Sequence, residues 1–159
     1  MPTTDTARRR TEHVMDPNIA QWVARTITRT SSVYALGVGA TILAGGSDRF
    51  NGLSYAVAIN TPGAPASWGV VIATAGLVML TGSLLAKPRV IGFGALLAAM
   101  WSLMFAWAFA VSAVRFADAN TTAPWSYGFL FLMFGVLSGA HFASNPIRLP
   151  GRRRRGVHE

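Results

Sequence analysis

The chain has 159 residues, of which 52% are hydrophobic and only 13% are charged, and its formal net charge is +8. A soluble globular domain keeps about a quarter of its residues charged, so this composition excludes an ordinary water-exposed surface and indicates a protein surrounded by lipid. The absence of cysteine excludes a disulfide scaffold, an iron–sulfur cluster, a thiolate zinc site and a cysteine nucleophile.

The N-terminal segment is predicted to lie outside the membrane. Residues 1–15 are polar, charged and aperiodic, so we expect a disordered tail on the cytoplasmic side. Asp16 and Pro17 are typical of a helix start, because an acid caps the first turn and proline fits its first position. The pattern that follows predicts a short amphipathic helix on the membrane surface, with a continuous extension of the first membrane helix as the alternative. Its apolar face consists of Ile19, Trp22, Val23 and Ile27.

Four apolar stretches follow, at about 30–46, 66–86, 90–114 and 125–144. The last three contain no charged side chain and reach about 31, 37 and 30 Å as helices, enough to cross about 30 Å of hydrocarbon. The first reaches only about 26 Å and is diluted by serine, threonine and glycine, and a cleaved signal peptide is a competing interpretation of it. The sequence therefore predicts an all-α integral membrane bundle of four transmembrane helices, with a membrane domain over residues 16–146.

Lysine and arginine are distributed unevenly between the two sides of such a bundle. Of the fourteen, five precede Thr30, two lie in the turn 87–89, and five lie in the basic tail 147–159. With four spans these twelve residues share one side, which the positive-inside rule makes the cytoplasmic side of a bacterial inner membrane. Both termini are therefore expected in the cytoplasm, near anionic lipid of the inner leaflet. The residues expected at this membrane surface are Arg25, Arg29, Lys87, Arg89, Arg152, Arg153, Arg154 and Arg155.

The longest outer loop is expected between the first two spans, at 47–65. Asn51 and Gly52 indicate a turn, and larger residues alternate with smaller ones over 53–59. Both an extended strand and a short interfacial helix fit this pattern. Aromatic residues at the starts of the second and fourth spans are expected at the depth of the outer headgroups. These residues are Trp68, Trp125 and Tyr127.

The sequence contains no pattern that indicates catalysis, a cofactor or a metal site. The spans hold no Asp or Glu, which disfavours ion-coupled transport. His141 is the one imidazole within the spans, and we interpret it as a hydrogen-bonded structural residue. Ser138 shares its helical face, but no acid accompanies the pair, so Ser–His chemistry is not indicated. We expect a non-enzymatic protein without a cofactor, and no nucleic-acid partner, because the arginine-rich tail has no aromatic platform beside it.

Small residues four apart occur in all four spans and predict close helix packing. Such spacing forms a notch on one helix face and lets two backbones approach in lipid, either within one chain or between copies. The predicted packing residues are Ala35, Gly39, Gly69, Ala73, Gly94, Ala98, Gly135 and Gly139. Two bulky sets on the third span are expected to face lipid or a second copy. They are Met100, Met104 and Trp107 on one side, and Trp101, Phe105 and Phe109 on the neighbouring side.

The stretch 49–84 contains Ser-Tyr-Ala-Val-Ala at 54–58, Pro-Gly-Ala-Pro at 62–65 and Ser-Trp-Gly at 67–69. In these segments the chain resembles small four-span membrane proteins encoded by viruses of actinobacteria, some of which are holin-like. The resemblance implies insertion into the host inner membrane and assembly there, and it carries no functional residue. We therefore expect a holin-like oligomer that permeabilises or depolarises the membrane during lysis. The alternatives are a membrane-anchored binding or regulatory partner of another protein, and a small transporter.

Overall fold

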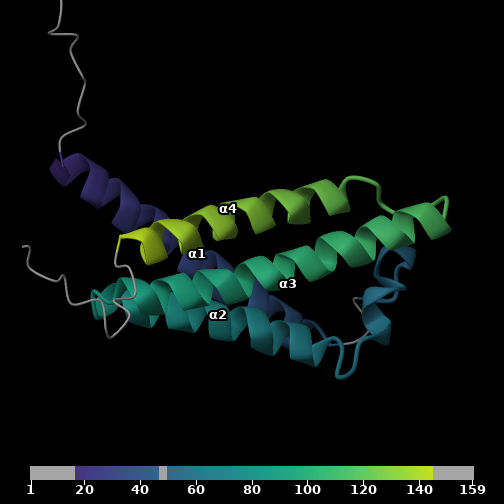
Figure 1. Cartoon of the computed structure of the whole chain (residues 1–159). Helices are drawn as coiled ribbons and strands as arrows, with labels where there is room; N and C mark the ends of the chain where they lie inside the picture. The colour runs from purple at the N-terminus through teal and green to yellow at the C-terminus, as the bar shows by residue number, and fades with distance from the viewer. Residues whose placement is uncertain (1–16, 47–49, 145–159) are drawn as a thin grey trace, which may run out of the picture.

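The computed structural model describes residues 17–46 and 50–144, and the regular structure of this part is entirely helical (Figure 1). The tails predicted at 1–15 and 147–159 lie outside the described residues. Four long helices dominate the described part, and two 3-10 turns lie between the first and the second. In chain order the elements are α1 (Pro17–Gly45), η3 (Leu53–Tyr55), η4 (Ala58–Asn60), α2 (Ala66–Leu84), α3 (Pro88–Arg115) and α4 (Ala123–Ala143).

Three helices of the described part are long and apolar enough to cross a membrane, judged by length and composition. They are α2, α3 and α4, with 19, 28 and 21 residues, and their ends lie within two residues of the predicted second, third and fourth spans. These three spans are thus confirmed as apolar helices of sufficient length. α1 falls short of the same hydropathy, because Arg25 and Arg29 and a run of threonine and serine occupy its first half.

The prediction of a separate short amphipathic helix at the N-terminus is wrong. α1 runs unbroken from Pro17 to Gly45, over 29 residues and about 43 Å. Pro17 stands at its first position, and no further proline and no glycine occurs before Gly37, so nothing in the sequence interrupts the backbone hydrogen bonds between the amphipathic segment and the apolar one. The continuous helix, the alternative interpretation, is the one that the structure adopts.

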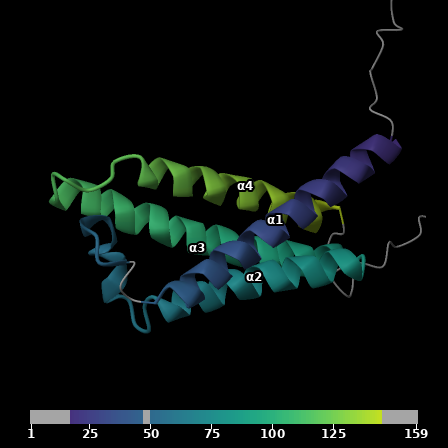
Figure 2. The same ribbon diagram turned by 180° about the vertical axis from the view of Figure 1, so that it is seen from behind.

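Each long helix packs against its neighbour in the chain and runs in the opposite direction (Figure 1). α1 runs diagonally across α2, and its N-terminal part extends beyond the other helices (Figure 2). The start of α1, the turn between α2 and α3 and the end of α4 lie together at one end of the bundle, which we call the Lys87 end. The opposite end, which we call the loop end, carries residues 50–65 and the connection between α3 and α4.

The loop 50–65 contains no strand. Its backbone forms local hydrogen bonds instead, from the Tyr55 N–H to the Gly52 carbonyl and from the Thr61 N–H to the Ala58 carbonyl. These bonds satisfy the backbone without a partner strand, which explains why the extended conformation is not needed. The alternation of larger side chains has another cause, since Tyr55, Val57 and Ile59 pack against the bundle core.

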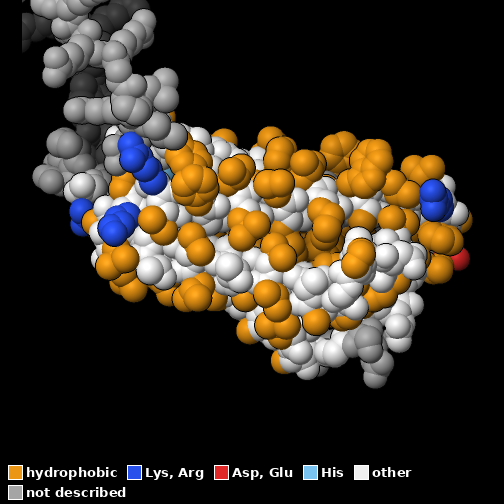
Figure 3. All heavy atoms as spheres, turned by 60° about the horizontal axis from the view of Figure 1, so that its bottom comes forward, with side chains coloured by type: hydrophobic (Ala, Val, Ile, Leu, Met, Phe, Trp, Pro, Cys, Tyr) orange, Lys and Arg blue, Asp and Glu red, His pale blue; other side chains and the backbone are white. Residues whose placement is uncertain are grey.

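The core contains aromatic residues that the sequence pattern assigned to the outer surface. Trp101, Phe105 and Phe109 are buried against the other helices of the bundle, so the prediction that they face lipid or a second copy is wrong. Met100 and Trp107, on the other side of α3, are exposed. In the view of Figure 3 hydrophobic side chains cover the middle of the molecule and the charged ones lie at its two ends, as lipid contact requires.

Candidate functional site

Gly39 and Gly69 bring the backbones of α1 and α2 into close contact. A Cβ atom added at Gly39 would lie 2.6 Å from the Ala73 Cβ and 2.8 Å from the Gly69 carbonyl oxygen. The contact continues at Gly76, which the spacing pattern missed, because a Cβ atom there would lie 2.8 Å from the Leu36 backbone nitrogen. Small residues on both helices therefore set the distance between α1 and α2.

Gly94 plays the same part between α3 and α2. A Cβ atom added there would lie 2.7 Å from the Met79 Cγ and 2.8 Å from the Ala75 carbonyl oxygen. Ala98, one turn further along α3, has no exposed surface, and neither has Ala35 on α1. Six of the eight predicted packing residues thus lie at contacts or in the core of the described chain.

Gly135 and Gly139 are the two that the described chain does not bring against another helix. A Cβ atom added at either, or at Gly128, would meet nothing within 4 Å. At about 100° per residue the three positions fall within about 40° on one side of α4, and we call them the glycine stripe. Only 11% of the most apolar segment of α4 is buried within the chain, against 50% for α3. The glycine stripe is therefore an open notch on the least covered of these helices.

Two polar contacts join helices near the Lys87 end. The Ser138 hydroxyl on α4 donates a hydrogen bond to the Gly92 carbonyl on α3, at 3.0 Å. His141 Nε2 lies 3.2 Å from the Thr28 hydroxyl on α1, which itself donates to the Ala24 carbonyl, so the imidazole N–H is the donor to Thr28. The hydrogen bond that we expected of His141 is thus present. Ser138 and His141 have different partners, and this arrangement contains no Ser–His catalytic pair.

The basic residues of the described part gather at the Lys87 end. Arg25 and Arg29 lie on α1 and border a hollow of about 650 Å³ that also contains His141, and Lys87 and Arg89 lie in and beside the turn between α2 and α3. Figure 3 shows Lys and Arg side chains at this end and a smaller group at the opposite end. Arg152, Arg153, Arg154 and Arg155, the other predicted membrane-surface residues, lie outside the described residues.

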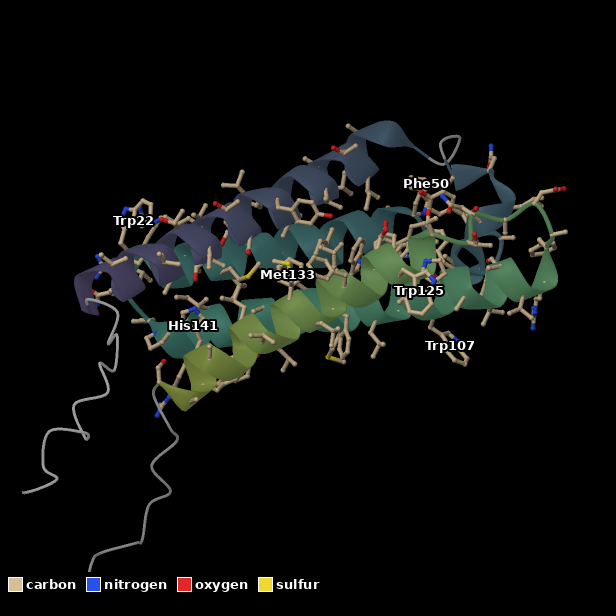
Figure 4. All side chains as sticks on the ribbon, turned by 90° about the horizontal axis from the view of Figure 1, so that it is seen from above. Trp22, Phe50, Trp107, Trp125, Met133 and His141 are labelled. Atoms are coloured by element: carbon tan, nitrogen blue, oxygen red, sulfur yellow. The ribbon has the colours of Figure 1, made fainter. Side chains whose placement is uncertain are left out.

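An aromatic cluster holds the loop end together. Trp68 is 3% exposed, donates its indole N–H to the Thr61 hydroxyl at 2.8 Å, and packs edge-on against Phe50 and Phe105. The Trp68 ring therefore lies inside the bundle at the loop end and does not face lipid. Trp125, by contrast, is 81% exposed and points away from the core (Figure 4).

Beside this cluster lies an open pocket of about 560 Å³. Its walls come from α1, the loop, α3 and α4, and we call it the aromatic pocket. It contains Tyr34, Gly37, Val38, Thr41, Ile42, Phe50, Tyr55, Trp101, Phe105 and Tyr127. Tyr34 and Tyr55 were not predicted as site residues from the sequence. Together with Tyr127 they are the three tyrosines of the chain, and all three line this pocket.

The residues that the structure describes contain no group of three or more His, Cys, Asp or Glu side chains placed to hold a metal ion. Comparisons with protein family models, with curated proteins and with solved structures find no match to the chain. The class of protein therefore comes from the fold itself. It is an all-helical protein with three helices, among the described residues, that are able to cross a membrane.

Proposed function

We propose that the chain is a four-span protein of a bacterial inner membrane that associates with copies of itself and permeabilises or depolarises that membrane, as a holin-like protein does. The glycine stripe is the observation that carries this proposal, because it leaves a helix notch with no partner in the described chain. In lipid, helices associate mainly through such close approach of their backbones, because lipid tails are as apolar as the side chains and the hydrophobic effect does not drive association.

Close packing against α2 supports the proposal that α1 also crosses the membrane, in addition to α2, α3 and α4. A helix that contacts the backbone of a spanning helix at Gly39 and again near Leu36 lies at the same depth of the membrane over that stretch. Arg25 and Arg29 fall toward the Lys87 end, where long side chains reach the headgroups.

The charge distribution supports an orientation with the Lys87 end in the cytoplasm. Four of the five basic residues in the described part lie at that end, and Arg115 lies at the other. By the positive-inside rule both termini would then be cytoplasmic, and the basic segment 147–159 would meet anionic lipid of the inner leaflet.

Expression in bacteria with a potential-sensitive dye tests the activity. We expect the wild-type chain to dissipate the membrane potential and arrest growth once it accumulates. The variant Gly135→Leu/Gly139→Leu fills the glycine stripe, so it should stay monomeric in crosslinking and leave the potential intact. Thr74→Leu adds similar bulk at an exposed position of α2 and serves as the matched control. Normal polarisation at high expression of the wild-type chain would contradict the proposal.

The same face of α4 also fits a helix of another membrane protein, which keeps the alternative of a binding or regulatory partner open to test. Crosslinking distinguishes the two, because a heterologous protein trapped without any homo-oligomer would favour the alternative. A small transporter is the third class, and it has the least support, since the described spans hold no carboxylate for coupling.

A further inference from the structure

The aromatic pocket at the loop end exists because α1 diverges from α4. The two helices meet through Thr28 and His141 near the Lys87 end, and the diagonal course of α1 across α2 carries it away from α4 toward the loop end (Figure 2). The space that opens there has a volume of about 560 Å³, within the range of pockets that hold small molecules.

The walls of the aromatic pocket suit a flat ring. Tyr127 stacks on Phe105 with ring centres 5.3 Å apart and an interplanar angle of 25°. Trp101 lies beside both, with ring centres 4.5 Å from Phe105 and 5.8 Å from Tyr127. These rings are packed against one another, so this wall of the pocket is rigid and binding there costs little side-chain entropy.

The aromatic pocket also carries hydrogen-bond donors that the described chain does not use. The indole N–H of Trp101 has no acceptor among the described residues, but its nitrogen has almost no accessible surface and does not open into the pocket. The hydroxyl groups of Tyr34, Tyr55 and Tyr127 likewise form no hydrogen bond within the described part of the chain. These hydroxyls are accessible, and a hydroxyl without an acceptor is unfavourable in lipid, so they favour a ligand that brings acceptors.

The charge of the lining residues and the location of the pocket restrict the class of ligand further. The lining residues within 17–46 and 50–144 are all uncharged, and this part of the wall favours a neutral ligand. Half of the pocket wall comes from α1, on which Tyr34 is 45% exposed on the outside of the bundle. A ligand would therefore enter from the bilayer, between α1 and α4.

We infer that the aromatic pocket binds an uncharged, planar, lipid-soluble ring with carbonyl acceptors, that is, a molecule of the quinone class. The ring lies beside Tyr127, and its carbonyl oxygens accept hydrogen bonds from the tyrosine hydroxyls. This binding depends on the membrane location of the chain and not on its self-association.

A matched pair of probes tests the inference on the full-length chain in lipid nanodiscs. Menadione is a naphthoquinone, and 2-methylnaphthalene has the same ring skeleton without the carbonyl groups. Equilibrium dialysis, corrected for partition into nanodiscs without protein, measures binding of each. We expect saturable binding of one menadione per chain, about tenfold tighter than binding of 2-methylnaphthalene, because only menadione supplies acceptors.

Three variants assign the binding to this pocket. Tyr127→Phe keeps the ring and removes a donor, so it should weaken menadione about fivefold and leave 2-methylnaphthalene unchanged. Gly37→Leu adds a side chain to the pocket wall, where a Cβ atom meets nothing within 4 Å, and should abolish saturable binding of both probes. Ser126→Ala removes an exposed hydroxyl outside the pocket and should change neither.

Two results would overturn the inference. Equal affinity for the two probes would mean that the pocket accepts any apolar occupant, such as a lipid acyl chain, and that the donors do not select a ligand. Binding of menadione that does not saturate, or that survives Gly37→Leu, would mean that the aromatic pocket is not the site. Neither result bears on membrane depolarisation, so this test and that of the proposed function fail separately.

Discussion

Two glycines on α1, two residues apart, differ completely in what surrounds them. A Cβ atom at Gly39 would collide with Ala73, whereas one at Gly37 would meet nothing within 4 Å. We expect Gly39→Leu to force α1 and α2 apart and to lower the free energy of unfolding by about 1–3 kcal/mol. Gly37→Leu, the control on the same helix, should leave it nearly unchanged. Unfolding by SDS in mixed micelles measures both, and equal stability of the two variants would contradict the described α1–α2 contact.

The hydrogen bond from Ser138 to the Gly92 carbonyl makes a second, smaller prediction. Hydrogen bonds between membrane helices contribute about 0.6 kcal/mol on average, and Ser138 is buried, so Ser138→Ala should destabilise the protein by about 0.5–1.5 kcal/mol. Ser126→Ala removes an exposed hydroxyl that bonds only to the nearby Thr122 carbonyl, so it should lower the free energy of unfolding much less. The same mixed-micelle titration compares them, and a larger loss for Ser126→Ala would refute the assignment.

Aromatic residues show how far a single sequence predicts the side-chain environment in a membrane protein. Trp68 and Trp125 both follow a proline near the start of an apolar helix, and the same headgroup position was predicted for both. Trp125 is exposed and Trp68 is buried against Phe105. A helix that is apolar on every side gives no amphipathic signal, so the sequence cannot tell the face toward the core from the face toward lipid.

Helices α2, α3 and α4 were predictable from the sequence because long charge-free apolar runs leave few other structures in lipid. The course of α1 was not, since its apolar part is short and the preceding segment is amphipathic, a pattern that fits one continuous helix as well as two separate ones. The conformation of the loop 50–65 was also open from the sequence, which fitted both an extended strand and a short helix. Its alternating residues pack on a core whose position depends on helices distant in the sequence.

Trp68 links the loop to the start of α2 by a hydrogen bond. The Trp68 N–H donates to Thr61, whose hydroxyl donates in turn to the Ala58 carbonyl. Trp68→Phe keeps an aromatic ring but breaks this chain of bonds, so we expect the loop to open more often and to be cleaved several-fold faster by a protease added from the loop side. Trp125→Phe, at an exposed site, is the control. Unchanged cleavage in Trp68→Phe would show that ring packing alone holds the loop.

The four helices use their small residues unequally, and this decides how the whole molecule is expected to behave. Gly39 on α1 and the glycines on α2 and α3 lie at contacts within the chain, whereas Gly37 and the three glycines on α4 have no such contact among the described residues. At the loop end α1 diverges from α4, and the aromatic pocket lies there. One molecule therefore offers two separate features to its surroundings, a notch for another helix and a pocket for a small ring.

Both features require that α1 crosses the membrane beside α2. The chain has no cysteine, so single cysteines give labelling without background. Gln21→Cys at the start of α1, Asn60→Cys in the loop and Ser144→Cys after α4 all replace exposed residues. Treatment of intact bacteria with a membrane-impermeant maleimide reports which of the three faces outward.

Four spans with the Lys87 end in the cytoplasm predict that only Asn60→Cys is labelled in intact cells, and that Gln21→Cys and Ser144→Cys react after permeabilisation. A chain with three spans, in which α1 lies on the membrane surface, would instead expose Gln21→Cys together with Asn60→Cys. Labelling of that second pattern would contradict the four-span account directly.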